Sequence, residues 1–595
     1  MTGPDKRNML VVWACVAAAA VAGIGLLVAS VQLSRYGMSG AARFSTDIRL
    51  SCFTREACQT LAHGAGIGGA AFMLAALVLV LVRRRIIVSV AALREGFRVI
   101  WRETVRLWRG LLREPLTLWP LLVITLTGAA VRAVYLSQPI RVDEAATYML
   151  YASKPFYQAL IISPNIPNNH PLHTLMVRGF SLLLGNQPWV LRMPAFLAGV
   201  ACVPAVYLAA RRFYGKAPAL VTAALVAASS VLAGYSVNAR GYTMICLAFL
   251  LLLTLATYLY RSRNRAGWLA YAILGMLGLF TVPVMLYPLG MVAMWLCLMT
   301  IVSQPRAQWA GGIGRISGYT ALSCLLAAVL YGPVITVCGL KVVVTNNYYV
   351  FPLPWREFAA AFLATLREVG LRWTGQIPLP LVALLAGGAA AAVLANSRVS
   401  RYPVSLATAA VLFLVPVLAA QHVAPFARVW AFLLPVCFML AAVGICLALA
   451  PLAARLGPRK EFAWALLALG LAAGLGRQVT QSGVIPYSDE TGVWRDARAV
   501  AATLRSRLQP GDRVLYYLLG EWPFKYYFSL QGTSDKYLTS EPREALRFWV
   551  AVAHNPGYWP LERIIAESGI EANRFLPPRE VQRYPEAVLY LLAPR

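Results

Sequence analysis

Residues 139–156 read PIRVDEAATYMLYASKPF and place two carboxylates, Asp143 and Glu144, directly after a long apolar run. No other Asp or Glu occurs between residues 117 and 356. Ionisable side chains are costly in a lipid bilayer, whereas soluble chains carry them throughout their length. A stretch so poor in carboxylates is therefore predicted to be a bundle of membrane-spanning helices, with this pair at one of its rims.

The composition of the whole chain supports a helical membrane protein with many spans. Of its 595 residues, 59% are hydrophobic and 13% are charged, which is about half the charged fraction of a typical soluble domain. The apolar residues gather in runs of about 20, long enough to cross a hydrocarbon core of ~30 Å. Thirteen spans are predicted, at residues 10–31, 66–82, 117–136, 188–210, 217–236, 241–260, 267–282, 284–303, 317–338, 378–396, 403–421, 428–450 and 462–477.

Clusters of Lys and Arg between the spans predict the orientation of the chain. Basic residues in short loops mark the cytoplasmic side of a membrane protein. The clusters fall at every second connection, at residues 83–109, 211–212, 261–265, 306–315, 398–401 and 455–460. The N-terminus is therefore predicted to be cytoplasmic. The loops at 137–187 and 339–377 and the tail from about 480 are predicted to lie outside.

The same clusters contribute much of the formal net charge of +30. A charge of this size can indicate nucleic-acid binding, but no nucleic-acid-binding motif accompanies it. Between apolar runs, basic residues instead orient helices and contact anionic lipid headgroups. We therefore expect a membrane protein that binds no nucleic acid. The high content of Ala, Arg and Gly is typical of a GC-rich bacterial source, which predicts the inner (plasma) membrane.

The chain divides into three predicted regions. Residues 1–116 hold a two-span extension and a basic cytoplasmic loop, residues 117–480 the membrane core, and residues 481–595 a small α/β soluble domain. The last region holds thirteen of the 24 acidic residues and alternates amphipathic stretches with short apolar runs. Three outer-loop segments are predicted to be amphipathic helices in the membrane interface. They are EAATYMLYA, PLHTLMVRGFSLLLG and WREFAAAFLATLREVGLRW.

Two of the ten cysteines, Cys52 and Cys58, share a polar loop that is predicted to lie outside the membrane. Disulfides form in oxidising environments of this kind, so the pair is a candidate disulfide. The other eight cysteines lie in or beside apolar runs, where cysteine acts as a small hydrophobic residue. The sequence contains no Cys or His spacing typical of a zinc site.

Most of the distinctive polar residues fall at the predicted outer ends of spans. A guanidinium group binds two oxygens of a phosphate and stays charged, while a carboxylate can take the proton of an attacking hydroxyl. Together they suit a substrate with a lipid tail in the bilayer, a phosphate at the surface and a transferable group outside. The candidate residues are Asp143, Glu144, Asn169, His170, Arg240, Tyr242, Tyr287, His422 and Arg428.

The carboxylate pair also has a structural explanation. Asp143 and Glu144 could form ion pairs with Arg132 or Arg141. Asp143 could cap a helix that begins at Glu144. Adjacent residues on a helix point about 100° apart, so we expect the two carboxylates to have separate roles.

The other candidates have structural alternatives as well. His170 precedes a proline, which favours an extended backbone, and a lone histidine is often structural. Arg240 and Arg428 could bind lipid headgroups. Asp143, Glu144 and His170 together could ligate a divalent ion such as Mg, Mn or Zn.

Four short motifs, in this order and on one predicted side, resemble the GT-C superfamily of glycosyltransferases. They are the Asp143–Glu144 pair, NHPL at 169–172, YSVNARGY at 235–242 and RVWAFLLP at 428–435. The resemblance covers roughly residues 117–480. It is strongest to enzymes that use polyprenyl-phosphate sugars, such as protein O-mannosyltransferases and the aminoarabinose transferases of lipid A.

The resemblance implies transfer of a sugar, with inversion, from a polyprenyl-phosphate donor to a lipid, glycan or protein acceptor of the cell envelope. By the same resemblance, Asp143 is the general base toward the acceptor hydroxyl and Glu144 positions the acceptor or a metal. His170, Arg240 and Arg428 hold the donor phosphate.

Two motifs depart from the usual pattern of this superfamily. The chain has VNAR at 237–240 where QEAR is usual, so any role of that acid is in doubt here. It also has HPL at 170–172 where HPP is frequent. The first two predicted spans precede the usual first span of the fold, and we expect them to act as an anchor.

Other functions remain open at this level. A lipid-linked-substrate flippase or transporter would tend to place ionisable groups near the middle of the membrane and to show repeat symmetry. Here they lie at the rim, and no convincing internal repeat is present. A structural protein that acts through its soluble tail would not need the carboxylate pair. A lipid-linked oligosaccharide ligase or an oligosaccharyltransferase is an alternative within the enzyme class.

Overall fold

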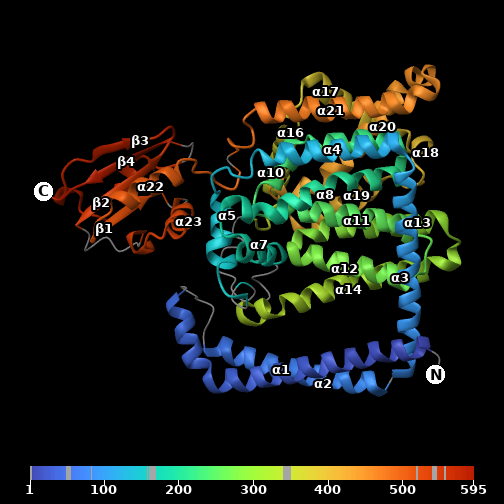
Figure 1. Cartoon of the computed structure of the whole chain (residues 1–595), viewed down its shortest axis with the longest axis horizontal. Helices are drawn as coiled ribbons and strands as arrows, with labels where there is room; N and C mark the ends of the chain where they lie inside the picture. Colours follow the sequence, from blue (N-terminus) through green and yellow to red (C-terminus); the bar gives the residue numbers. More distant parts are fainter. Residues whose placement is uncertain are drawn as a thin grey trace.

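The computed structural model describes most of the chain, and helices dominate it (Figure 1). The described residues are 3–47, 55–81, 83–156, 159, 169–339, 350–488, 490–517, 520–538, 546–554 and 558–595. Among them, nine helices are long and apolar enough to cross a membrane. They are α1 (Gly3–Asp47), α2 (Arg55–Leu81), α4 (Pro115–Ala133), α8 (Pro188–Tyr214), α11 (Tyr242–Leu259), α13 (Leu286–Ser303), α14 (Arg306–Cys338), α20 (Leu434–Arg455) and α21 (Lys460–Gln481).

Four other predicted spans fall on bent or short helices. Two bent pairs raise the number of spans to eleven if each pair is one span. They are α9 (Lys216–Ala227) with α10 (Ser230–Ser236), at 59°, and α16 (Trp355–Thr374) with α17 (Leu379–Leu394), at 117°. The remaining two, α12 (Arg265–Thr281) and α19 (Leu406–Gln421), have only 17 and 16 residues. By length and composition, the described helices thus include nine to eleven candidate spans, and the rest of the thirteen predicted spans fall on the shorter apolar helices α12 and α19.

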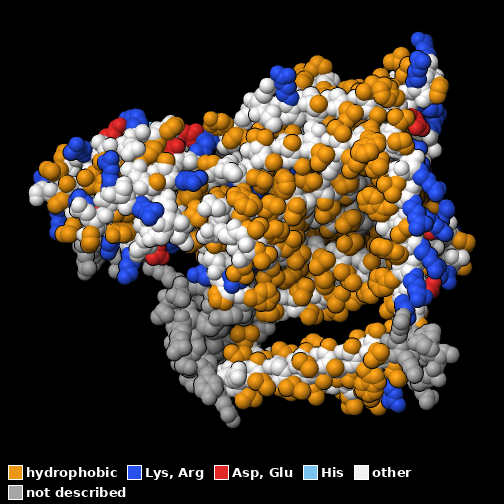
Figure 2. All heavy atoms as spheres, viewed as in Figure 1, with side chains coloured by type: hydrophobic (Ala, Val, Ile, Leu, Met, Phe, Trp, Pro, Cys, Tyr) orange, Lys and Arg blue, Asp and Glu red, His pale blue; other side chains and the backbone are white. Residues whose placement is uncertain are grey.

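The core helices lie side by side, and the C-terminal sheet domain packs against one end of them (Figure 1). We call this end the domain end. Helix α3 (Arg83–Leu112) crosses the opposite end, and the α1–α2 hairpin lies beside the bundle. Hydrophobic side chains cover the sides of the bundle, while Lys and Arg side chains gather over α3 (Figure 2). This banding is what a protein embedded in a bilayer requires.

Helix α3 corrects one sequence expectation, because the basic segment was expected to be a loop. Its arginines and apolar residues alternate with helical spacing, and two Glu–Arg pairs three residues apart support the helix. Arg98 Nη1 donates to Glu95 Oε2 at 3.0 Å, and Arg106 Nη1 donates to Glu103 Oε1 at 2.6 Å. The basic region is therefore one continuous amphipathic helix.

A buried arginine fixes the break between α9 and α10. Arg132 of α4 is fully buried. Its Nη1 donates to the carbonyl oxygen of Ala227 at 2.7 Å and its Nη2 to that of Val226 at 3.2 Å. Its Nε donates to Ser236 Oγ at 3.0 Å. These contacts satisfy carbonyl groups that the end of α9 leaves free, which is the condition for irregular backbone at membrane depth.

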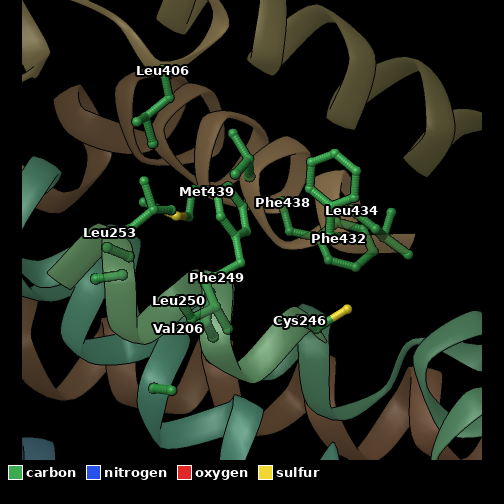
Figure 3. Packing of buried hydrophobic residues seen from close by; sticks show 14 of the residues in the cluster. Val206, Cys246, Phe249, Leu250, Leu253, Leu406, Phe432, Leu434, Phe438 and Met439 are labelled. Atoms are coloured by element: carbon green, nitrogen blue, oxygen red, sulfur yellow. The ribbon is translucent and has the colours of Figure 1, made fainter. Parts of the chain in front are cut away.

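The largest hydrophobic core extends through most of the bundle, and Figure 3 shows the part of it that residues of α8, α11, α19, η3 (Ala427–Leu433) and α20 form. Phe249 and Phe432 pack edge to face, with ring centroids 5.5 Å apart. Helices α17 and α20 approach closely at Gly388 and Gly444. A Cβ atom on Gly444 would lie 2.0 Å from the Cα atom of Gly388, so only glycine allows this crossing.

Short elements connect the helices near their ends. At the domain end lie the helices α5 (Val142–Thr147), η1 (Tyr148–Ala152) and α7 (Pro171–Leu184). Each of the three segments predicted as an amphipathic helix is helical, in α5–η1, α7 and α16. The other short elements are η2 (Pro283–Met285), α18 (Asn396–Val399), η3 (Ala427–Leu433) and η4 (Gly457–Arg459).

The C-terminal region forms the predicted small α/β domain. Its four-stranded sheet has the order β1-β2-β4-β3, in which β1 and β2 are parallel and the other pairs antiparallel. The strands are β1 (Asp512–Tyr516), β2 (Arg547–Ala553), β3 (Arg579–Arg583) and β4 (Ala587–Leu592). The helices are α22 (Ala497–Arg507), α23 (Glu521–Gln531) and α24 (Leu561–Glu567), and the 3-10 helices are η6 (Asp535–Leu538) and η8 (Ala572–Arg574).

The domain shares a hydrophobic core with the loop that holds the carboxylate pair. Ile140, Ala145 and Tyr148 belong to one buried cluster with Trp494 and Phe524 of the C-terminal region. The domain therefore helps to fix the backbone on both sides of Asp143 and Glu144.

The candidate disulfide lies outside the described residues, because neither the position of Cys52 nor the side chain of Cys58 is described. Seven other cysteines, at described positions, are free thiols: Cys15, Cys202, Cys246, Cys297, Cys324, Cys437 and Cys446.

Candidate active site

Glu144, in α5, lies in a buried network that joins three parts of the domain end. Arg192 of α8 donates from Nε to Oε1 at 2.8 Å and from Nη2 to Oε2 at 2.6 Å. The backbone N–H groups of Arg141 and Ala239 donate to the same carboxylate at 2.8 and 2.7 Å. A carboxylate offers about four acceptor positions, so these four bonds saturate Glu144.

The network also determines the charge of Glu144. Burial alone would raise the pKa of this carboxyl group, but the charge and hydrogen bonds of Arg192 hold the pKa below its usual value. Glu144 is therefore an anion at neutral pH, and its oxygens are committed to the protein itself. Its place in the structure is that of a positioning residue for the backbone around Asp143.

Arg192 is a central residue that the sequence reasoning missed. It is fully buried. Besides the two bonds to Glu144, it donates to the carbonyl oxygens of Leu136, Gln138 and Pro139 at 2.8, 2.7 and 2.9 Å. A signal was present, since Arg192 is the only charged residue between residues 188 and 210, and an isolated charge in a span indicates a specific partner.

The sequence suggested ion pairs of Asp143 or Glu144 with Arg132 or Arg141, and the structure shows other partners for the side chains of these two arginines. The guanidinium of Arg141 donates to the carbonyl oxygens of Ile485, Ser488 and Glu490 at 2.7, 3.1 and 2.9 Å. It thereby fastens the segment of residues 482–496 that leads from α21 to the C-terminal domain, which we call the linker. At the start of α5, Glu144 rather than Asp143 accepts the N–H of Arg141.

Asp143 differs from Glu144 in its surroundings, as expected for neighbours on a helix. Its side chain is partly exposed, while that of Glu144 is buried. Its backbone N–H donates to the carbonyl oxygen of Thr491 in the linker at 3.2 Å. Its carboxylate interacts electrostatically with Arg428, as does that of Glu490.

Arg428 lies in η3, at the domain end of α20, and is partly exposed. Its guanidinium carbon lies 4.5 Å from the centre of the Phe426 ring, so a cation–π contact orients the group. Arg428 and Asp143 therefore place a permanent cation and a partly exposed carboxylate at the same end of an apolar bundle.

His170, at the start of α7, contacts the non-helical segment that precedes α11. Its Nδ1 accepts a hydrogen bond from the N–H of Gly241 at 2.8 Å, which leaves the proton of the neutral ring on Nε2. Burial, followed by the nearby charge of Arg240, holds the pKa of His170 well below its usual value. The ring therefore offers a neutral donor. A Cβ on Gly241 would lie 2.4 Å from Thr281 Cγ2 and 3.1 Å from His170 Nδ1, so this contact requires glycine.

Arg240 and Tyr242 surround His170. Arg240 is buried and donates from Nη1 to Thr147 Oγ1 at 3.2 Å. The ring of Tyr242 packs edge to face on His170, with centroids 5.2 Å apart. His173, on the same face of α7, is fully buried, and burial lowers its pKa to about 3. It is therefore a neutral, structural ring.

Three other predicted residues have roles in local packing. Asn169 accepts a hydrogen bond from Thr174 Oγ1 at 2.8 Å and so steadies the start of α7. Tyr287 donates to Gln421 Oε1 at 2.7 Å. His422, at the end of α19, has a positive φ of 51° and packs on Trp355 with ring centroids 4.2 Å apart.

Tyr287 stacks on Trp430 with ring centroids 6.1 Å apart, and His422 packs against Phe358 with ring centroids 5.9 Å apart. These two predicted site residues thus belong to an aromatic group that runs from α13 and α19 to α16.

Glu490 is a second residue that the sequence reasoning missed. Both of its carboxylate oxygens accept hydrogen bonds from the hydroxyl of Tyr235, at 3.0 and 2.9 Å. Arg372 Nη1 lies 3.5 Å from Oε2. Burial raises the pKa of Glu490. In the sequence this residue is one of many acids in the tail, and nothing marks it as a partner of residues near position 235.

The three residues suggested as metal ligands do not fit a divalent ion. Both oxygens of Glu144 and the Nδ1 of His170 are engaged in the hydrogen bonds given above. Within the described ranges, no group of three His, Cys, Asp or Glu side chains is arranged to hold a metal ion.

Comparison with known proteins bears on the fold. A solved structure of ArnT from Cupriavidus metallidurans bound to undecaprenyl phosphate aligns with a TM-score of 0.50 and 14% sequence identity, covering 80% of this chain and 98% of that chain. An Archaeoglobus fulgidus oligosaccharyltransferase in the apo form aligns with a TM-score of 0.43 and 13% identity, covering 67% of this chain and 59% of that chain. No curated protein sequence matches the chain.

The chain therefore shares its fold with the ArnT structure. The family model for dolichyl-phosphate-mannose-protein mannosyltransferase matches residues 167–331, which contain Arg192, Arg240 and Tyr287. The family match covers less than a third of the chain. Together with the shared fold, it agrees with the resemblance to GT-C glycosyltransferases that the four short motifs indicated.

Proposed function

We propose that the protein is an inverting glycosyltransferase that moves a sugar from a polyprenyl-phosphate donor to a hydroxyl group of a cell-envelope acceptor. The observation that carries the proposal is the presence of a partly exposed carboxylate, Asp143, and a permanent cation, Arg428, at one rim of an apolar bundle. The undecaprenyl phosphate named with the ArnT structure supports the choice of donor class.

In the proposed reaction, Asp143 takes the proton of the acceptor hydroxyl as its oxygen attacks the anomeric carbon. The bond from that carbon to the phosphate oxygen breaks, and its electron pair leaves on polyprenyl phosphate. Attack opposite the leaving group inverts the anomeric centre. Arg428 and Arg240 bind phosphate oxygens and offset the charge that develops there.

The remaining residues have supporting roles in this proposal. His170 donates its Nε2–H to the phosphate as a neutral group. Glu144 does not touch the reacting atoms, and it positions Asp143 through the backbone of α5. Asn169, Tyr242, Tyr287 and His422 shape the surrounding site through the packing described above.

The proposed location follows from the distribution of charge. The arginine-rich α3 marks the opposite end of the bundle as cytoplasmic by the positive-inside rule, so Asp143 and the C-terminal domain face outside. In a bacterial inner membrane, a donor and an acceptor lipid or glycan would both meet the site there. A protein acceptor on the outer side of the membrane would meet the site in the same way.

The test is a transfer assay with purified protein in liposomes. Undecaprenyl-phosphate glucose, mannose, galactose and aminoarabinose would be offered with lipid, polysaccharide and peptide acceptors. We expect transfer from at least one donor, with release of undecaprenyl phosphate and an inverted linkage by NMR. Absence of transfer from every donor, together with movement of the lipid donor between leaflets, would identify a flippase instead.

A further inference from the structure

A pocket of about 150 Å³, with both polar and apolar residues in its lining, lies next to the proposed active site. It is bounded by α10, the end of α16, the linker and Ala427, which precedes Arg428 in the chain. Most of the bundle is apolar, yet this pocket is lined by Arg141, Tyr235, Asn238, Arg372, Gln376 and Glu490. A concave site with a few convergent polar groups is typical of small-molecule binding.

Two lining residues carry buried polar atoms that have no hydrogen-bond partner within the described part of the chain. Asn238 is 4% exposed and uses its Nδ2 to donate to Thr491 Oγ1 at 3.3 Å, but its Oδ1 has no partner. Arg141 is also 4% exposed, and its Nε has no partner. Buried polar atoms are nearly always paired in folded proteins. The lining residues therefore carry one acceptor and one donor that no described protein group uses.

The charges around the pocket indicate a neutral ligand. Arg141 already donates to three backbone carbonyl oxygens. Arg372 lies between two carboxylates, with its Nε 2.7 Å from Glu368 Oε1 and its Nη1 3.5 Å from Glu490 Oε2. A phosphate in the pocket would face the Glu490 carboxylate, so the lining favours hydroxyl groups over an anion.

The size and lining suit one sugar ring. The volume of about 150 Å³ is well above the ~10–15 Å³ that a single water molecule needs. Trp373 adds an aromatic surface, and Tyr235, Asn238, Gln376 and Glu490 add donors and acceptors. Sites that hydrogen-bond a substrate hydroxyl discriminate strongly against an analogue in which that hydroxyl is missing or misplaced.

We propose that this pocket binds the hydroxyl groups of a single sugar residue, and that Glu490 and Asn238 determine which sugar is accepted. The proposal rests on the glycosyltransferase function above. The sugar has two possible sources, the transferred sugar of the donor and a sugar residue of a glycan acceptor. The chemistry of the pocket is the same for both.

The test uses the full-length protein in nanodiscs and the variant Glu490→Gln, with Glu368→Gln as the matched control. Both glutamates contact Arg372, but only Glu490 lines the pocket. Dissociation constants would be measured for undecaprenyl phosphate and for its glucose, mannose and galactose derivatives. If the pocket holds the donor sugar, Glu490→Gln should reduce the preference among these epimers about tenfold, with each affinity taken relative to that of the same variant for undecaprenyl phosphate. Glu368→Gln should behave as wild type.

Kinetics with a glycan acceptor distinguish between the donor sugar and the acceptor sugar as the ligand of the pocket. If donor preference is unchanged but the KM for a glycan acceptor rises about tenfold in Glu490→Gln, the pocket holds the acceptor sugar. Gln376→Ala, at a partly exposed position, provides a second lining variant if Glu490→Gln does not fold. If a lining variant transfers sugar with wild-type donor preference and wild-type acceptor KM, the proposal for the pocket is wrong, and the proposed function is unaffected. A wild-type protein that binds neither the bare carrier nor any sugar derivative would overturn both.

Discussion

Replacement of Glu144 by glutamine should destabilise the protein severely, because it breaks a saturated buried network. The carboxylate accepts four hydrogen bonds, two on each oxygen. Glutamine keeps one of the two side-chain oxygens, but the other becomes an NH₂ group, which cannot accept the two hydrogen bonds that this oxygen accepted. Two buried donors then lose their acceptor, at about 1–3 kcal/mol each, and Arg192 keeps an uncompensated charge. We expect a loss of about 3–5 kcal/mol in the free energy of unfolding.

The assay is equilibrium unfolding in mixed micelles, followed by tryptophan fluorescence. Asp143→Asn is the matched control, since it makes the same chemical change one residue away on a partly exposed side chain. It should cost about 1 kcal/mol or less.

A double variant, Glu144→Gln with Arg192→Met, should be less unstable than the sum of the single variants, by about 3 kcal/mol, because the unpaired charge is gone. If Glu144→Gln were as stable as Asp143→Asn, the assignment of Glu144 as the centre of the network would be wrong.

Two further predictions follow from the same contacts. Arg192 lowers the pKa of Glu144 below the usual value of 4.5. The stabilisation from this group is therefore complete above pH 4.5 and is lost as the pH falls through the lowered pKa. Melting temperatures measured against pH should show this loss in the wild type and not in Glu144→Gln. Gly444→Ala should lower stability by about 1–3 kcal/mol, because its Cβ would meet Gly388, whereas Gly387→Ala, which faces open space, should not; unfolding in mixed micelles compares the two.

The fold was largely predictable because its main determinants are local. Span positions follow from the length and polarity of each apolar run, and each predicted span falls on an apolar helix. The exceptions have local causes too. Helix α19 begins three residues after the predicted start of its span, at residue 406 instead of 403, whereas α12 covers almost all of the predicted span 267–282. The basic segment at residues 83–109 was interpreted from its charge as a cytoplasmic loop, and its helical spacing was not considered, so α3 was not predicted.

The site was predictable only in part, because its key contacts join distant residues. The motifs placed Asp143, His170, Arg240 and Arg428 at one end of the bundle, where the structure also has them. Glu144, however, pairs with a residue 48 positions away. Glu490 meets Tyr235 across 255 positions. A single sequence contains no signal for such pairs, since they depend on how helices and the C-terminal domain pack.

The charge state of His170 could not be predicted either. From the sequence it was a candidate ligand for a phosphate or a metal. In the structure, its Nδ1 is occupied by Gly241 and its surroundings keep the ring neutral. The burial that decides this comes from α7, α11 and α12 together, none of which is visible from the NHPL motif alone.

The central claim, that Asp143 is the general base of sugar transfer, is tested most directly by steady-state kinetics of Asp143→Asn in liposomes. The donor and acceptor would be those that the wild-type protein uses. Removal of a general base typically lowers kcat by about 10²–10⁴-fold. The account predicts such a fall, with an unchanged dissociation constant for the donor and unchanged folding. A kcat within twofold of wild type would contradict it.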